Sequence, residues 1–270
     1  MKLASVHKED KIKARIAVIA LFFIIAIAAV FSEKLREGYE IASTRIFPDG
    51  ARAFAYGERH FTADDPKAYD VDLAEYFFNR AQMLDPNLPY VNHELARIDF
   101  LKGVYGAALA HIAVQIEQEG DKMPNSYYVK GLIEGYMGQY DASARDYEHF
   151  LRFDPYNWAG LNDYAWVLLK AGRDKDAFFA TSKGLEKFPD NPWLLNSNAI
   201  ALYEMGYLKD AKLQAQHALD EGKSISLADW LHAYPGNDPR IAKDGVEAFK
   251  RAMEENMHSI ISSTSTHALQ

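Results

Sequence analysis

The residues of this sequence that could do chemistry lie in an acidic run, in scattered histidines and in one glycine-rich stretch. The acidic run "ADDPKAYDVD" spans residues 63–72, and its carboxylates could attract a calcium ion. It lacks the glycine and the distal glutamate of a calcium-binding loop, so a solvated acidic turn is the favoured interpretation. The carboxylates belong to Asp64, Asp65, Asp70 and Asp72.

Nine histidines are spread along the chain, and four of them lie between residues 93 and 217. Their spacing is not typical of metal ligands, so we interpret them as solvated histidines or as residues that line a groove. These four are His93, His111, His149 and His217.

The glycine-rich stretch "GLIEGYMG" spans residues 131–138 and permits three interpretations. A phosphate-binding loop needs a preceding strand and a lysine, and this stretch has neither. A GxxxG contact between membrane helices is disfavoured because Glu134 lies inside the motif, far from the apolar segment of the chain. Close packing of helix backbones is the interpretation that remains.

Other signatures of catalysis are absent from the sequence. The chain has no cysteine, which excludes disulfides, thiolate catalysis and cysteine zinc sites. No HExxH, GxSxG, GxxxxGKS/T or EF-hand pattern occurs. We therefore predict no enzymatic activity, no cofactor and no metal site.

The charge of the chain argues against nucleic acid as a partner. Five of the 30 basic residues and two of the 38 acidic residues lie in the first 32 positions, which leaves 25 basic and 36 acidic residues in 33–270. An acidic protein does not displace the counterions that surround nucleic-acid phosphates, so it gains no binding free energy from their release. We expect no nucleic-acid partner.

An unbroken apolar run of sixteen residues, Ile16–Phe31, follows the basic N-terminus. As a helix it would span roughly 24 Å, which is short for a bilayer core of about 30 Å. We interpret residues 16–32 as a single transmembrane anchor. A cleaved signal peptide with Ala26-Ile27-Ala28 as its cleavage pattern is the alternative. A soluble core helix is disfavoured because the run has no polar face.

The flanking charges set the expected orientation of this anchor. Five basic residues precede the run, and Lys34, Arg36 and Arg45 follow it. By the positive-inside rule, the basic segment 1–15 is cytoplasmic and the remainder is extracytoplasmic, on the outer side of a cytoplasmic (inner) membrane. The absence of an Asn-x-Ser/Thr site fits a bacterial chain.

An internal repeat accounts for half of the chain. Four windows of 24 residues align without gaps, and the eleventh residue of each is glycine, with spacings of 35, 34 and 34. A small residue lies seven positions before each glycine and another five positions after it. This pattern predicts two short helices that pack closely around a glycine turn. The glycines are Gly103, Gly138, Gly172 and Gly206, in windows 93–116, 128–151, 162–185 and 196–219.

This repeat resembles the tetratricopeptide repeat (TPR) family, whose 34-residue unit carries small residues at positions 8 and 20, glycine near 15, an aromatic residue near 24 and proline at 32. Pro155 and Pro189 match position 32, and Tyr147 matches position 24. Asp99 and Glu134 depart from the family at position 11, where a carboxylate needs a buried partner or a different local rotation. The resemblance implies an all-α fold, a right-handed superhelical solenoid of antiparallel helix pairs, here preceded by the transmembrane helix.

The same resemblance defines the expected segments. We expect four TPR units in residues 89–225 and a degenerate unit with an inserted loop in 51–88. We expect a juxtamembrane linker in 33–50 and C-terminal capping helices in 226–257. The Ser/Thr-rich tail, 258–270, is expected to be disordered.

TPR proteins present a concave groove lined by the first helix of each unit, and the resemblance places a set rich in aromatic residues there. Asn162 and Asn196 could pair with an extended peptide backbone, although capping or solvating an early helical turn is an equal alternative. At Gly135 we expect a depression that receives a ligand side chain. The groove residues are Tyr90, His93, Arg97, Phe100, Tyr128, Leu132, Gly135, Tyr136, Asn162, Trp166, Trp193, Asn196 and Tyr203.

Two functions are consistent with these expectations. In the first, a membrane-anchored scaffold binds a peptide or a helix of a partner protein in the groove. In the second, the protein is a structural subunit of a homo-oligomer or of a larger envelope complex, and its groove is filled internally.

Overall fold

The computed structural model describes residues 15–16, 18–25, 27, 32–62, 65–233 and 238–267. Over these ranges the regular structure is helical and no strand occurs, which confirms the predicted all-α class. The chain forms two compact units. One combines the residues up to 61 with 70–88, and the other combines 62–69 with 89–270.

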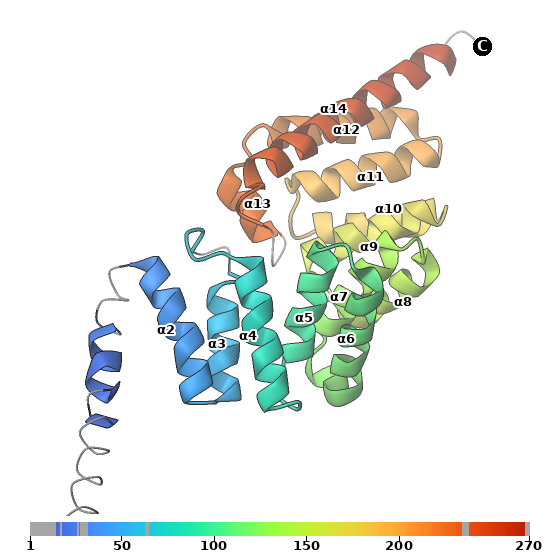
Figure 1. Cartoon of the computed structure of the whole chain (residues 1–270). Helices are drawn as coiled ribbons and strands as arrows, with labels where there is room; N and C mark the ends of the chain where they lie inside the picture. The colour runs from blue at the N-terminus through green and yellow to red at the C-terminus, as the bar shows by residue number, and fades with distance from the viewer. Residues whose placement is uncertain are drawn as a thin grey trace, which may run out of the picture. The chain divides into compact units, whose positions relative to one another are not determined.

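The first unit contains helices α2 (Glu33–Ile46), α3 (Gly50–Arg59) and α4 (Val71–Leu84), shown in Figure 1. Asp49 and Asp70 cap α3 and α4, because each side chain accepts a hydrogen bond from a backbone N–H of the first helical turn. α3 packs on α4 where Gly57 faces the ring of Phe78, and a Cβ at Gly57 would lie 2.6 Å from that ring. The absence of a side chain at Gly57 allows this close approach.

Residues 33–50 were expected to form a linker, but most of them form helix α2. Glu40 is buried at 2% exposure, and its carboxylate lies 2.8 Å from His60 Nε2 and 3.2 Å from Arg59 Nη1. A buried ion-pair cluster therefore joins α2 to the end of α3. Hydrophobic periodicity could not reveal this contact, because the buried positions of α2 are polar.

The predicted N-terminal segments are described only in part. Residues 1–14 lie outside the described residues, as do six positions within the predicted anchor 16–32. The described positions between 15 and 27 are helical, and their large apolar side chains, such as Phe23 at 68%, are mostly exposed. Among the helices that the structure describes, none is long and apolar enough to cross a membrane.

The second unit contains four helix pairs in chain order, with a short 3-10 turn, Gly120–Lys122, before the second pair (Figure 1). All four repeat glycines adopt a left-handed backbone, with φ between 70° and 83°. An L side chain is strained in that region, so the predicted glycine turn is confirmed. The pairs are α5 (Val91–Leu101) with α6 (Tyr105–Glu119), α7 (Asn125–Tyr136) with α8 (Tyr140–Leu151), α9 (Trp158–Lys170) with α10 (Asp174–Leu185), and α11 (Pro192–Glu204) with α12 (Leu208–Gly222).

The small residues predicted to lie between paired helices are buried. Ala96, Ala165 and Ala199 on the first helices have exposures of 1% or less. At Gly131 a Cβ would lie 3.2 Å from both the carbonyl oxygen of Ser143 and the ring of Tyr147. Close packing of backbones is confirmed as the reason for this glycine.

Beyond the repeats lie α13 (Leu227–Ala233) and α14 (Ala242–His267), and α14 packs along α12 (Figure 1). The prediction of a disordered tail from residue 258 is wrong as far as His267, because α14 continues through it. Met257 and Ile260 are buried against Ala211 and Ala215 of α12. The Ser/Thr-rich composition of the tail suggested disorder, although Met257 and Ile260 are apolar residues at helical spacing.

Candidate partner-binding surface

The first helices of the four units contact one another in order, α5 with α7, α7 with α9 and α9 with α11. Their neighbouring faces carry the predicted groove residues, and we call this surface the first-helix face. The structure brings some of the predicted residues together in a partly exposed row, buries others, covers a third group with α14 and leaves three residues outside these groups.

Aromatic rings from the first three units form a continuous row on the first-helix face. The ring of Tyr136 lies 5.0 Å from that of Phe100, nearly perpendicular to it, and 5.5 Å from that of Trp166. Tyr105 extends the row, with its ring 6.3 Å from Tyr136. We call Phe100, Tyr105, Tyr136 and Trp166 the aromatic row. Tyr105 was not among the predicted groove residues, because it begins α6, a second helix.

Tyr136 is the most exposed member of the aromatic row, and the residue is 57% exposed. Phe100, Tyr105 and Trp166 are half-buried. Burial of part of the ring raises the pKa of the Tyr136 phenol above its ordinary value, with a smaller contribution from the charge of Asp163.

The depression predicted at Gly135 does not exist. Gly135 is buried, and a Cβ there would lie 2.8 Å from Trp166 Cζ3 and 3.0 Å from Val167 Cγ1. The side chains of α9 already fill the space that a ligand was expected to enter. Gly135 lets α7 and α9 approach each other, and its groove-lining role is corrected to helix packing.

Asn162 and Asn196 were expected to form hydrogen bonds with the backbone of a bound peptide. In this structure each of them forms a hydrogen bond with a residue of another helix. Asn162 is 8% exposed, and its Oδ1 accepts a hydrogen bond from Ser197 Oγ at 2.8 Å. Asn196 Oδ1 accepts one from Asn256 Nδ2 of α14 at 3.0 Å. A peptide would have to displace these bonds to reach either amide.

Similar bonds link the first helices of the earlier units. Tyr128 OH donates to Asp163 Oδ2 at 2.6 Å, and His93 Nδ1 lies 3.2 Å from Ser126 Oγ. Burial, aided by the charge of Arg97, lowers the pKa of His93 to about 3, so this imidazole is neutral at physiological pH. His93 and Tyr128 therefore join first helices to each other, although Tyr128 is only partly buried.

α14 covers the predicted groove residues of the fourth unit. Trp193 is 8% exposed, and its ring stacks on that of Phe249 at 4.9 Å. Tyr203 packs beside the cluster that includes Met257 and Ile260. The sequence predicted capping helices after the repeats but gave no sign of which surface they would cover.

Three predicted groove residues remain outside these groups. Tyr90 is 40% exposed, and its ring lies edge-on to that of His93 at 5.9 Å. Arg97 Nη1 pairs with Glu94 Oε2 at 2.5 Å, and Leu132 is half-buried. These three residues lie on the first-helix face, and their assignment to the groove stays a prediction.

The two acidic departures at position 11 both have partners inside their helix pairs. Asp99 Oδ2 lies 2.8 Å from His111 Nδ1. Lys130 Nζ lies 3.1 Å from Glu134 Oε1 and joins α7 to α8 through Asp146. Burial, and after it the neighbouring Asp146 carboxyl group, raises the pKa of Glu134 to about 7 against the opposing charge of Lys130. Each carboxylate therefore has a partner within its helix pair, but the partners His111 and Lys130 are half-buried, with side chains 30% exposed.

The fold is that of TPR-type helical repeat proteins. The sequence matches no family model and no curated protein. The structure is similar to that of the MamA protein, at 15% identity and a TM-score of 0.54, over 63% of this chain and 92% of that one. It is also similar to YrrB, described as a TPR protein with an unusual peptide-binding site, at 11% identity and a TM-score of 0.57, over 68% and 93% of the two chains.

A third solved structure, the thermophilic TPR protein TTC0263 of Thermus thermophilus, has 17% identity and a TM-score of 0.51, over 68% of this chain and 97% of that one. All three identities are low, so the likeness shows the fold alone. The expected TPR fold is thereby confirmed for the part of the chain that these structures cover.

Proposed function

We propose that this chain is a protein–protein interaction scaffold that binds a peptide or a helix of a partner protein on the first-helix face, at the aromatic row. The repeats form a right-handed superhelical solenoid, and residues 16–32 anchor it to a cytoplasmic membrane with the repeats on the extracytoplasmic side. The protein is bacterial and has no enzymatic activity of its own.

The observation that carries the proposal is the aromatic row, in which Tyr136 is exposed and the other three rings are half-buried. Aromatic rings supply a large contact area at low entropic cost and recur at the centres of protein interfaces. Phe100, Tyr136 and Trp166 come from three successive units, so an extended ligand could contact all three. The peptide-binding site reported for YrrB supports a peptide as the ligand class.

A pair of exposed aromatic residues allows a matched test of this surface. Tyr136 on α7 and Phe179 on α10 are both 57% exposed, but Phe179 belongs to a second helix outside the aromatic row. Partners crosslinked to the tagged full-length chain in cells are recovered and quantified for Tyr136→Ala, Phe179→Ala and the unsubstituted chain. Tyr136→Ala should recover less partner and Phe179→Ala the same amount. Equal recovery from all three chains contradicts the proposal.

The anchor proposal rests on the apolar run and on its exposure. Phe23 and Ile24 are 68% and 64% exposed, which is costly in water and favourable in a lipid phase. We expect the mature chain to keep its N-terminal residues and to stay in the membrane fraction after carbonate extraction. Intact mass measurement separates the alternatives, because a cleaved signal peptide would remove the chain up to about residue 28.

A structural subunit is the second candidate function. It is favoured by the covering of Trp193 and Tyr203 by α14, since part of the predicted groove is filled from within the chain. Light scattering on the detergent-solubilised full chain tests it. An oligomer of constant size at all protein concentrations would support this function. A monomer at every concentration would contradict the homo-oligomer form of it.

A further inference from the structure

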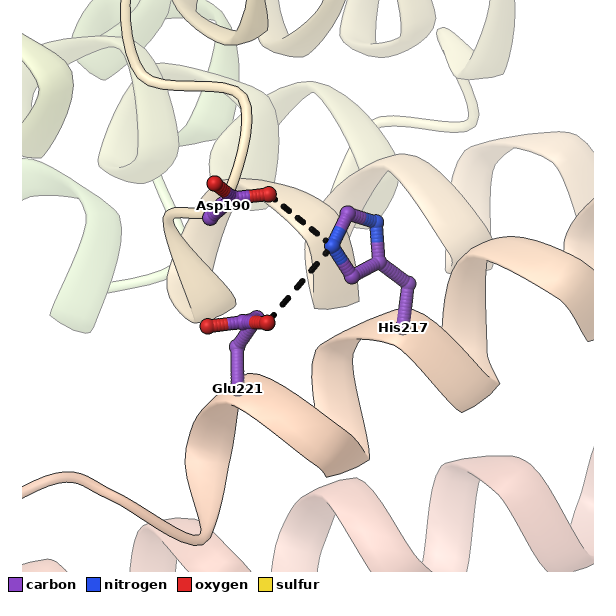
Figure 2. Close-up of side chains that lie close together, drawn as sticks. All are labelled: Asp190, His217 and Glu221. Carbon is purple, nitrogen blue, oxygen red and sulfur yellow. Dashed lines mark hydrogen bonds and ion pairs between the residues drawn. The ribbon is translucent and has the colours of Figure 1, made fainter.

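Three side chains that can bind metal ions lie together at the edge of the fourth helix pair (Figure 2). His217 and Glu221 are one turn apart on α12, and Asp190 lies in the turn that leads into α11. His217 Nε2 is 3.1 Å from Asp190 Oδ1 and 3.9 Å from Glu221 Oε1. We propose that these three residues bind a divalent transition-metal ion of the Zn²⁺ type.

The distances fit a single ion with little rearrangement. Nitrogen and oxygen ligands lie about 2.0–2.2 Å from Zn²⁺, so neighbouring ligands of a tetrahedral ion are roughly 3.3–3.6 Å apart. The ligand atoms of this group all lie within 4.8 Å of one another, and the two distances from His217 Nε2 bracket the ideal value. Rotations of exposed side chains are enough to close the remaining gap.

The chemistry of the three ligands selects the kind of ion. An imidazole nitrogen suits Zn²⁺, Cu²⁺ and Ni²⁺, whereas Ca²⁺ and Mg²⁺ prefer oxygen ligands alone. The side chains of Asp190, His217 and Glu221 are 66%, 40% and 41% exposed. Water can therefore reach the ion and complete its coordination, and the bound ion would tie α12 to the turn before α11.

The second unit provides an internal comparison. His149 occupies the same repeat position as His217, and its Nε2 lies 2.6 Å from Asp121 Oδ1, in the turn before α7. The residue four positions further on is Phe153, which follows the end of α8. This unit has the histidine–aspartate pair without the third ligand. Within the described residues, the fourth unit alone assembles three such ligands.

The sequence alone did not identify His217 as a metal ligand. The spacing of His217 and Glu221 is that of ligands on one helix face, but Asp190 lies 27 residues before the histidine. Only the helix pair brings that aspartate to the imidazole.

The test measures Zn²⁺ binding by the full-length chain, solubilised in detergent and stripped of metal with a chelator. Zn²⁺ is titrated against a competing colorimetric chelator for the unsubstituted chain, His217→Ala and the matched control His149→Ala. Circular dichroism without metal verifies that the variants keep their helices. His217→Ala should weaken binding at the site at least about tenfold, because even the loss of residues that only orient ligands costs that much.

His149→Ala should bind Zn²⁺ like the unsubstituted chain, and Asp190→Asn and Glu221→Gln should each weaken binding. Zn²⁺ should also raise the unfolding temperature of the unsubstituted chain but not that of His217→Ala. Unchanged affinity and stoichiometry in His217→Ala would overturn the proposal, as would an equal loss in His149→Ala. If the unsubstituted chain binds no Zn²⁺, the proposal is wrong.

Discussion

Gly135 gives the sharpest test of how the first helices pack. A Cβ at this position would lie 2.8 Å from Trp166 Cζ3, 3.0 Å from Val167 Cγ1 and 3.2 Å from Ser143 Oγ. Alanine favours a helix over glycine by about 1 kcal/mol, whereas forcing a methyl group into a filled core costs about 1–3 kcal/mol. Gly135→Ala should therefore lower the free energy of unfolding by up to about 2 kcal/mol.

A glycine with free space provides the matched control. Gly106 lies in α6 of the preceding unit, and a Cβ there meets nothing within 4 Å. Gly106→Ala should raise the free energy of unfolding by up to about 1 kcal/mol. Denaturant unfolding followed by circular dichroism, with both variants and the unsubstituted chain, measures the difference. If Gly135→Ala stabilises as much as Gly106→Ala, the space beside Trp166 is open and the packing account of Gly135 is refuted.

Three further predictions concern titration, inter-helix bonding and the repeat turn. The pKa of Glu134 is about 7 in the folded state, above its ordinary value of 4.5. Folding therefore takes up a proton between pH 4.5 and pH 7, and the free energy of unfolding falls as pH rises through this range. Glu134→Gln should reduce this pH dependence, as thermal unfolding at pH 5 and pH 8 would show. Tyr128→Phe removes the hydrogen bond to the buried carboxylate of Asp163 and should cost about 1.5–3 kcal/mol in urea unfolding, so an unchanged midpoint contradicts the role given to this bond. Gly172 has φ of 70°, and Gly172→Ala should cost about 1–2 kcal/mol in the same assay; no cost would mean that the turn does not need glycine.

The repeat pattern was visible in the sequence because it depends on local geometry. Glycines at a fixed period predicted left-handed turns, and Ala96, Ala165 and Ala199 predicted close helix contacts. These requirements recur in every unit, so four copies of the pattern reinforce one another. The TPR-like fold could therefore be predicted with no structure in hand.

The parts that the sequence did not reveal depend on contacts between distant residues. The contact of α2 with α3 depends on Glu40 and His60, which are polar and carry no apolar period. The place of Gly135 was assigned from the family groove, but the ring of Trp166, about one repeat later, fills the space. α14 was expected as a cap, and only the structure places Phe249 on Trp193.

The central claim is that a partner protein binds at the aromatic row, and site-specific photo-crosslinking tests it most directly. A photo-crosslinking amino acid is placed at position 136, on the row, or at position 179, equally exposed on α10, in the full-length chain in cells. We predict a discrete crosslinked partner protein from position 136 and none from position 179. Equal crosslinking from both positions, or a partner captured only at 179, would contradict the account.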